Sequence, residues 1–266
     1  MKKVFFNKYE SVSSFLNALE KRPLNPMWSS AIKESEGTTK SHVEFTTTTC
    51  MESADYLFKY GDKSNYEKIK KVADKISVKG TGTRQKRRVK ASMVGCVPHI
   101  GNYLAGDPNN MINIVKERVS SNKIVNILYN PAVSWWVSAS DIIEAGVKVL
   151  SKIKAMESQG YRINLYTLDF RANRSFTEFV AYAIRIKASD QYTDPMKLAY
   201  PLVNPSFTRR HGFKFIETES RISDRYFTRG YGVPITNEDQ VREMLTGQAI
   251  KVDLYYCVET ALKLKL

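Results

Sequence analysis

The chain has 266 residues, 42% of them hydrophobic and 26% charged, which is typical of a folded protein with a sizeable core and excludes a fully disordered chain. Its 41 Lys and Arg against 27 Asp and Glu leave a formal net charge of +14. That excess favours anionic partners such as nucleic acid, although a basic protein without any dedicated partner has the same composition.

The cysteines and the apolar runs predict a protein of the cytoplasm. Cys50, Cys96 and Cys257 form no C-x-x-C pair, which excludes a disulfide framework and a zinc cluster and is typical of a reducing compartment. The apolar run at the N-terminus is too short for a signal peptide. Because no apolar stretch approaches the ~18 residues of a membrane helix, we expect no membrane contact.

The first part of the chain predicts mainly helices. A short strand at residues 3–6 precedes a helix capped by Ser11 and ended by Pro23. After a loop in which Trp28 is expected as a packing anchor, the β-branched segment 42–49 predicts a strand. Two further helices are expected on either side of Gly61, the second capped by Ser64.

The most basic run of the chain is residues 80–90, GTGTRQKRRVK, and it has two interpretations. As an exposed arm it would contact phosphates of nucleic acid, which Lys and Arg neutralise whatever the base sequence. As an edge strand its charges would prevent aggregation. It is not a nucleotide-binding loop, because it lacks the third glycine of the dinucleotide motif and a G-K-[ST]. The candidate binding residues are Arg84, Lys86, Arg87, Arg88 and Lys90.

Residues 97–122 predict two helices. The first ends near Gly106, and the second has Asp107 as its cap and Pro108 at its first position. The apolar residues expected to face inward in the second helix are Met111, Ile114, Val115 and Val119.

Residues 123–170 predict one strand–helix–strand unit, with strands KIVNILYN and YRINLYTLDF joined by a long helix that ends at Gly160. Such a unit implies parallel pairing of its strands. Ligands bind beyond the carboxyl ends of strands in open α/β sheets. We therefore expect a binding loop at residues 130–136, with a second segment at 169–171.

The rest of the chain continues the α/β pattern. We expect a long strand at 176–190, a helix starting at Pro195, a helix after Asn204, an irregular loop before a helix capped by Asn237, and a last strand at 251–260. The predicted fold is α/β with a mainly parallel sheet flanked by helices. Residues 1–90 are expected to form a mainly helical region with a basic arm, and residues 91–266 the α/β domain.

A second group of cations is interleaved with aromatic residues. Arg209 and Arg210 lead it, and the sequence adds Arg171, Arg174, Arg221, Arg225 and Arg229. Arg with aromatic rings suits single-stranded nucleic acid. The same arginines could instead form internal ion pairs with Glu217 and Glu219.

The loop after the strand KIVNILYN (123–130) resembles the metal-binding loop of von Willebrand factor A-type domains, whose motif is D-x-S-x-S. Here the matching residues are Asn130, Ala132 and Ser134, so only the last Ser is kept. Without the Asp and the first Ser, a divalent cation would lose its anionic ligand, and we expect no metal and no cofactor. Trp135 and Trp136 follow, either as a hydrophobic contact surface or buried under the sheet edge.

YLAGDPNNM (103–111) and NPSFTRRHGF (204–213) are similar to segments of an uncharacterised bacteriophage protein family with a degenerate domain of this type. The resemblance implies a phage source and a binding role. Because such domains often act beside MoxR-type AAA+ ATPases, it also implies that class of protein as a partner.

Three functions remain open. The first is a non-enzymatic adaptor that binds a protein or nucleoprotein assembly in the host cytoplasm. The second is direct nucleic-acid binding through residues 84–90 and the Arg/aromatic region. The third is a metal-dependent nuclease using Asp169, Asp190 and Asp194, although these acids would equally serve as caps of helices and turns.

Overall fold

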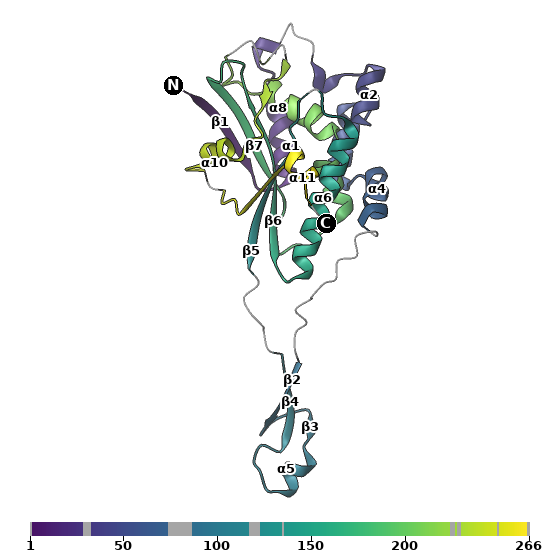
Figure 1. The fold of residues 1–266 in the computed structure, drawn as a ribbon, viewed down its shortest axis with the longest axis vertical. Helices are drawn as coiled ribbons and strands as arrows, with labels where there is room; N and C mark the ends of the chain where they lie inside the picture. The colour runs from purple at the N-terminus through teal and green to yellow at the C-terminus, as the bar shows by residue number, and fades with distance from the viewer. Residues whose placement is uncertain are drawn as a thin grey trace.

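The computed structural model describes residues 2–28, 33–73, 87–116, 123–134, 136–223, 227, 230–248 and 250–264. Its elements form a mixed α/β fold, with one large and mostly parallel sheet flanked by helices and one small antiparallel sheet (Figure 1). The α/β class and the mainly parallel sheet predicted from the sequence are confirmed. Within these described ranges, no helix is long and apolar enough to cross a membrane.

The large sheet has the strand order β1-β7-β6-β5-β9, and β8 pairs with the C-terminal end of β6. Parallel pairing joins β1 to β7 and joins β5 to both β6 and β9, whereas β6 and β7 are antiparallel. The strand–helix–strand unit predicted at residues 123–170 is therefore present, with its two strands parallel. The strands are β1 (Lys3–Tyr9), β5 (Ile124–Asn130), β6 (Arg162–Ala172), β7 (Glu178–Lys187), β8 (Val233–Pro234) and β9 (Leu254–Cys257).

Helices cover both faces of the large sheet. One face carries α1, α3, α6, α7, α8 and α11, and the other carries α10, as the two sides of the sheet in Figure 1 show. The helical elements are α1 (Val12–Lys21), η1 (Pro26–Trp28), η2 (Glu34–Glu36), α2 (Lys40–Thr46), α3 (Met51–Tyr60), α4 (Lys63–Ala73), α5 (Ile100–Leu104), α6 (Ala139–Ser158), α7 (Pro195–Val203), the π-helical turn η3 (Phe207–Gly212), α8 (Phe213–Glu217), α10 (Glu238–Leu245) and α11 (Val258–Leu262).

The long helix α6 shows how the sequence specifies this packing. Ser138 caps its first turn by accepting a hydrogen bond from the Asp141 amide, and its apolar positions recur at helical spacing over β5 and β6. Gly146 lies against α7, where an added Cβ would stand 2.1 Å from the Leu202 carbonyl oxygen. Only glycine therefore allows the two helices to approach this closely.

Residues 2–73 contribute to the same core as the C-terminal half. β1 forms an edge of the large sheet, and Phe15 of α1 stacks on Tyr182 of β7 with ring centroids 5.1 Å apart. Trp28, expected as a packing anchor, is fully buried against Tyr231. The boundary expected at residue 90 falls within β2 (Arg87–Ser92). The described contacts of residues 2–73 run mainly to the large sheet and its helices.

The strand predicted at residues 42–49 is wrong, because this segment begins with the helix α2. Thr46 donates its hydroxyl hydrogen to the His42 carbonyl, one helical turn back, and Thr47 ends the helix with a φ of 59°. Phe45 packs under the Arg209 guanidinium at 5.1 Å. Tertiary packing therefore overrides the β propensity of the threonines.

The second helix predicted within residues 97–122 is also wrong, because Met111–Lys116 forms strand β4. The Asp107 carboxylate accepts a hydrogen bond from the Asn109 amide at 2.8 Å, so it closes a turn where a helix cap was expected. β4 pairs with β2 along its length. Apolar residues in MINIVK fit both periodicities, and backbone pairing with β2 selects the strand.

Candidate functional site

Residues 87–116 form a small unit that we call the small-sheet module. It contains β2, β3 (Val97–Pro98), α5 and β4, with antiparallel strands in the order β2-β4-β3, and it lies apart from the large body in Figure 1. Local hydrogen bonds specify its turns: His99 Nδ1 accepts from the Asn102 amide, and the Asn102 side chain donates to the Asn109 carbonyl. Gly95 packs so close to β4 that a Cβ would stand 2.3 Å from a backbone oxygen.

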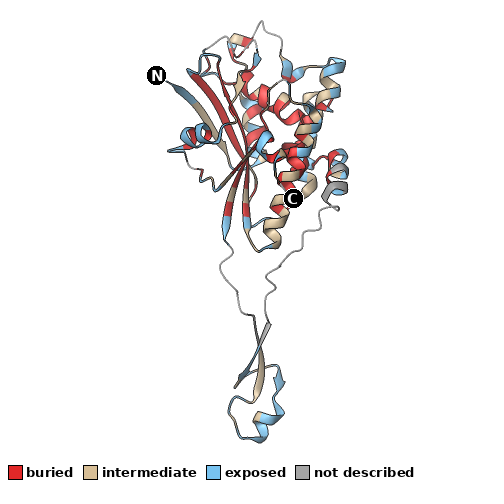
Figure 2. Cartoon of the chain, in the orientation of Figure 1, coloured by how far each residue is buried: buried red, intermediate tan, exposed pale blue. Residues whose placement is uncertain are grey.

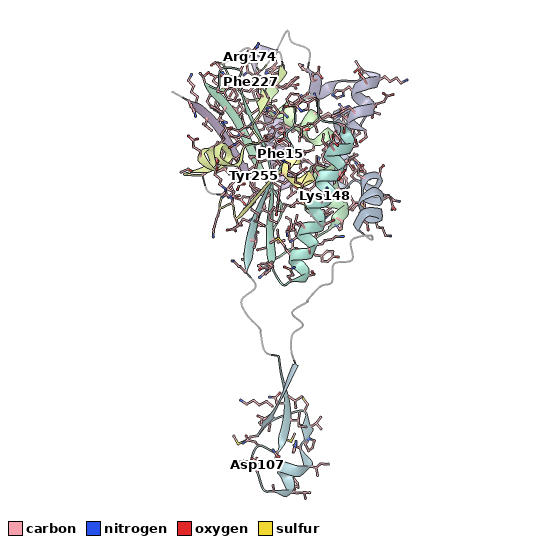
Figure 3. All side chains as sticks on the ribbon, in the orientation of Figure 1. Phe15, Asp107, Lys148, Arg174, Phe227 and Tyr255 are labelled. Atoms are coloured by element: carbon pink, nitrogen blue, oxygen red, sulfur yellow. The ribbon has the colours of Figure 1, made fainter. Side chains whose placement is uncertain are left out.

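The described side chains of the module form no buried core. Each of them is exposed or intermediate, as the colours of Figure 2 show, and they stand out from the ribbon in Figure 3. Half of the large hydrophobic side chains that are exposed in the described structure lie in this one unit. They are Val89 (68% exposed), Met93 (70%), Val94 (77%), Val97 (53%), Ile100 (71%), Tyr103 (68%) and Leu104 (79%).

Most of the exposed apolar side chains of the module lie in a segment without charge. Residues 91–106 contain no charged side chain, whereas β2 carries Arg87, Arg88 and the exposed Lys90 immediately before them. No acidic residue occurs between Lys75 and Gly106. Of the basic run predicted as a binding site, Arg84 and Lys86 lie outside the described residues.

The sequence reasoning missed this apolar surface because residues 97–122 were interpreted as two helices, the second with an inward apolar face. A signal was nevertheless present in the sequence. Sixteen consecutive uncharged residues, with large apolar side chains and glycines at 95, 101 and 106, are unusual for a loop exposed to water. A charge-free segment beside a basic run therefore predicts an interaction surface better than either feature alone.

The loop after β5 lies at a topological switch point of the large sheet. The chain continues from β5 to β6 on one side, and β9 pairs with β5 on the other side. Asn130, at the position of the metal-binding Asp, is fully buried. Its Nδ2 donates to the Ile235 carbonyl at 2.8 Å and to the Tyr255 hydroxyl at 3.3 Å, and its Oδ1 accepts from the Ala132 amide. These contacts require an amide, since a carboxylate has no hydrogen to donate to Ile235.

The other residues of this loop differ in exposure. Ser134 is half-buried, and its carbonyl accepts a hydrogen bond from the Val137 amide. Trp136 is 68% exposed, so the interpretation that buries both tryptophans is wrong for this one. Trp135 lies outside the described residues. Across the described part of the chain, no group of three or more His, Cys, Asp or Glu could hold a metal ion.

Arg210, predicted to bind nucleic acid, is fully buried and holds the N-terminal segment in place. Its guanidinium donates to the Thr48 hydroxyl and carbonyl and to the carbonyls of Ser35 and Gly37, at 2.6–3.2 Å. The neighbouring Arg209 lies between the rings of Phe45 and Phe213. Burial and the nearby Arg171 lower the pKa of Arg209.

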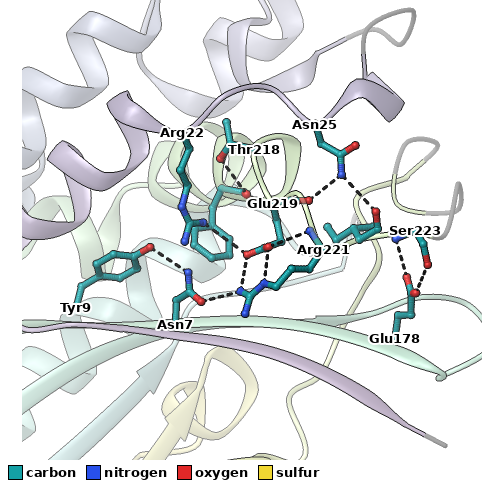
Figure 4. Close-up of polar contacts among 11 residues, drawn as sticks. Asn7, Tyr9, Arg22, Asn25, Glu178, Thr218, Glu219, Arg221 and Ser223 are labelled. Atoms are coloured by element: carbon teal, nitrogen blue, oxygen red, sulfur yellow. Dashed lines mark hydrogen bonds and ion pairs between the residues drawn. The ribbon is translucent and has the colours of Figure 1, made fainter.

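Other arginines of the Arg/aromatic region also have internal partners. Arg171 forms a buried bidentate ion pair with Asp169, with Nε–Oδ1 and Nη2–Oδ2 distances of 2.7 and 3.1 Å. Arg221 pairs with the buried Glu219, which Arg22 also approaches, as Figure 4 shows. Arg221 therefore forms an internal ion pair with one of the two expected acids, Glu219, whereas the internal partner of Arg171 is Asp169. Arg174 is exposed, and Arg225 and Arg229 lie outside the described residues.

The acids proposed for a nuclease have separate contacts. Asp169 pairs with Arg171, and Asp194 caps α7 by accepting from the amides of Met196 and Lys197. Asp190 lies in the turn before α7.

A buried relay that the sequence did not reveal joins Asp55, His211 and Tyr200. His211 Nε2 lies 2.9 Å from Asp55 Oδ1, and its Nδ1 lies 2.9 Å from the Tyr200 hydroxyl. Burial lowers the pKa of His211 despite the Asp55 carboxylate, and burial also raises the pKa of Tyr200. The relay links α3 to η3 and α7. His211 and Tyr200 have no exposed surface, whereas the Asp55 side chain is partly exposed, so Asp55 gives the relay its contact with solvent.

A search of the curated proteins and a search of the solved structures each found no match to this chain. A family model described as "Domain of unknown function (DUF7192)" matches residues 1–259. The match includes the large sheet, the small-sheet module and α10, and it ends within α11. The chain therefore belongs to the family described as Domain of unknown function (DUF7192).

Proposed function

We propose that this protein is a non-enzymatic adaptor that binds a protein or nucleoprotein assembly, and that the small-sheet module is its docking element. The observation that carries the proposal is the set of seven large apolar side chains that the module exposes. Contiguous apolar surface on a soluble chain marks an interaction site. The third strand, β3, adds only two residues to the pair of β2 and β4. Because an isolated pair of strands is marginal in water, a partner that covers the sheet would stabilise it.

The partner that fits this surface is a protein with an apolar contact patch and an acidic rim. Ile100, Tyr103 and Leu104 would enter the patch, where each fully covered side chain contributes roughly 1.5–3 kcal/mol. Lys90 and the two arginines of β2 would meet acidic side chains at the rim, because no acidic residue lies near them in the sequence. Charge complementarity of this kind directs the encounter and sets its salt dependence.

Two further parts of the proposal concern the fold of the large body and the source of the protein. We propose a von Willebrand factor A-like body whose metal loop has become a contact loop. The position of that loop at the switch point beside β5 supports this, as do the exposed Trp136 and the amide contacts of Asn130. The segments 103–111 and 204–213 support a phage source, a place in the host cytoplasm, and an AAA+ ATPase or nucleoprotein complex as the assembly bound.

A pull-down from cells in which the protein acts tests the adaptor function. We expect the tagged full chain to retain one dominant protein, and Leu104→Asp to reduce that retention by roughly tenfold or more. Val4→Asp is the matched control, since Val4 is exposed on β1 outside the module, and it should retain the partner. If Leu104→Asp retains the partner as well as the wild type, or if only nucleic acid or lipid is recovered, the proposed function is wrong.

Direct nucleic-acid binding is the second candidate, and the acid-free stretch from Lys75 to Gly106 favours it. It predicts binding of labelled DNA or RNA that weakens steeply with added salt, with a smaller salt slope after Arg87→Ala and Arg88→Ala. Absence of binding at about 50 mM salt would exclude this candidate.

A further inference from the structure

A pocket of about 700 Å³ opens in the large body, on elements that the proposed docking element does not use. Its walls are the first turn of α1, the C-terminal end of α3, the end of β7 with the turn that follows, and the first two turns of α7. This volume lies within the range of sites that hold small organic molecules and cofactors.

Most charged groups that line the pocket already have partners. Glu10 pairs with Lys8 and Arg185. The hydrogen bond from Lys8 is the main cause that lowers the pKa of Glu10. Lys187 is buried and contacts Glu157, as well as two backbone carbonyls. Asp194 caps α7. These groups build the walls and add little net charge to the pocket.

Two exposed lysines give the pocket its free charge. Lys59 lies in the last turn of α3 and Lys197 lies in the first turn of α7, so they reach the pocket from different elements. Among the described residues, neither ammonium forms an ion pair or a hydrogen bond through its side chain. Two such cations on one pocket favour a ligand with a compact anionic group.

The remaining lining is aromatic and apolar. Tyr60 and Tyr192 line the pocket and are 60% and 89% exposed, so their rings are open to a ligand. The deeper lining includes the buried side chains of Phe58 and Leu198 and the half-buried Val12. An inorganic anion would leave this lining unused, whereas a ligand with a flat ring would stack on a tyrosine.

We propose that this pocket binds a small anionic ligand that carries an aromatic ring, of the mononucleotide class. Lys59 and Lys197 bind its phosphate, and Tyr60 or Tyr192 stacks on its base. The site is independent of the small-sheet module, so the protein combines a docking element with a separate small-molecule site.

Calorimetric titration of the full chain with AMP, adenosine and inorganic phosphate tests this site. We expect AMP to bind with a Kd below about 1 mM, and adenosine and phosphate each to bind at least about tenfold more weakly. The double variant Lys59→Ala/Lys197→Ala should weaken AMP binding about tenfold or more, and Tyr192→Ala should weaken it several-fold.

The controls separate this site from general attraction to a basic protein. Lys40→Ala removes a lysine whose side chain is 90% exposed on α2, away from the pocket, and should leave AMP binding unchanged. Leu104→Asp should also leave it unchanged, which distinguishes failure of this site from failure of the docking element. The proposal is overturned if AMP binds no better than phosphate, or if Lys40→Ala weakens AMP binding as much as the double variant does.

Discussion

Asn130→Asp restores the acidic residue of a D-x-S-x-S loop, and we expect it to destabilise the protein. The Asn130 amide donates at 2.8 Å to the Ile235 carbonyl and is fully buried, so the new carboxylate would face that oxygen without a hydrogen to share. A lost hydrogen bond costs about 1 kcal/mol and an unpaired buried acceptor about 1–3 kcal/mol. We therefore expect a loss of about 3 kcal/mol in the free energy of unfolding, roughly a hundredfold in the folding equilibrium.

Urea denaturation of the wild type and the variant at pH 8 measures this loss. Asn7→Asp is the matched control, because Asn7 Oδ1 accepts a hydrogen bond from Arg221 Nη2 at 2.7 Å and a carboxylate strengthens that contact. The same substitution should therefore be tolerated at residue 7. Burial raises the pKa of a new carboxyl group at residue 130, so part of the loss should be recovered at pH 5, where the protonated group can donate.

Addition of Mg²⁺ separates two accounts of this loop. If the amide has a structural role, millimolar Mg²⁺ leaves the midpoint of Asn130→Asp unchanged. If Mg²⁺ restores the variant to wild-type stability or beyond, the loop is a cation site that lacks only its acid, and the reasoning from the Ile235 contact is refuted.

Three further changes test the packing and the buried polar groups. Arg210→Met should lower the free energy of unfolding by about 3–5 kcal/mol, measured in urea, because it leaves several buried acceptors unpaired; a loss under about 1 kcal/mol would contradict the described contacts. Burial lowers the pKa of His211 and of His42 below the ordinary 6.5, so the unfolded chain takes up protons first as the pH falls. Stability should be complete above pH 6.5 and decline below it, and a flat urea midpoint from pH 7.5 to pH 5 would contradict this burial. Gly146→Ala should lower the melting temperature by several degrees because its Cβ meets the carbonyl of α7, whereas Gly101→Ala, whose nearest contact would be 3.4 Å, should leave it nearly unchanged.

The elements that could be predicted from the sequence are those with a strong period and clear ends. The unit at residues 123–170 combines an apolar strand, a capped helix of about five turns and Gly160, which has a φ of 90°. Each of these local signals agrees with the final packing. The strand at 176–190 and the helix after Asn237 were predictable for the same reason.

The elements that were mispredicted depend on partners distant in sequence. β4 is a strand because β2 pairs with it, and no local signal in residues 111–116 excludes a helix. The burial of Arg210 depends on acceptors from residues 35, 37 and 48, which are more than 160 positions away. An arginine next to aromatic residues therefore looks like a nucleic-acid contact until the fold supplies its acceptors.

These long-range bonds also affect how the chain reaches its folded state during synthesis. Asn25 donates to the carbonyls of Glu219 and Ile222, as Figure 4 shows, and the α1 and α3 faces close against η3 and α8. At about 5–20 residues per second, a ribosome needs roughly 10–40 s to proceed from residue 25 to residue 222. During that interval the apolar faces of α1 and α3 lack their cover. These faces therefore stay uncovered until almost the whole of the chain described here has emerged.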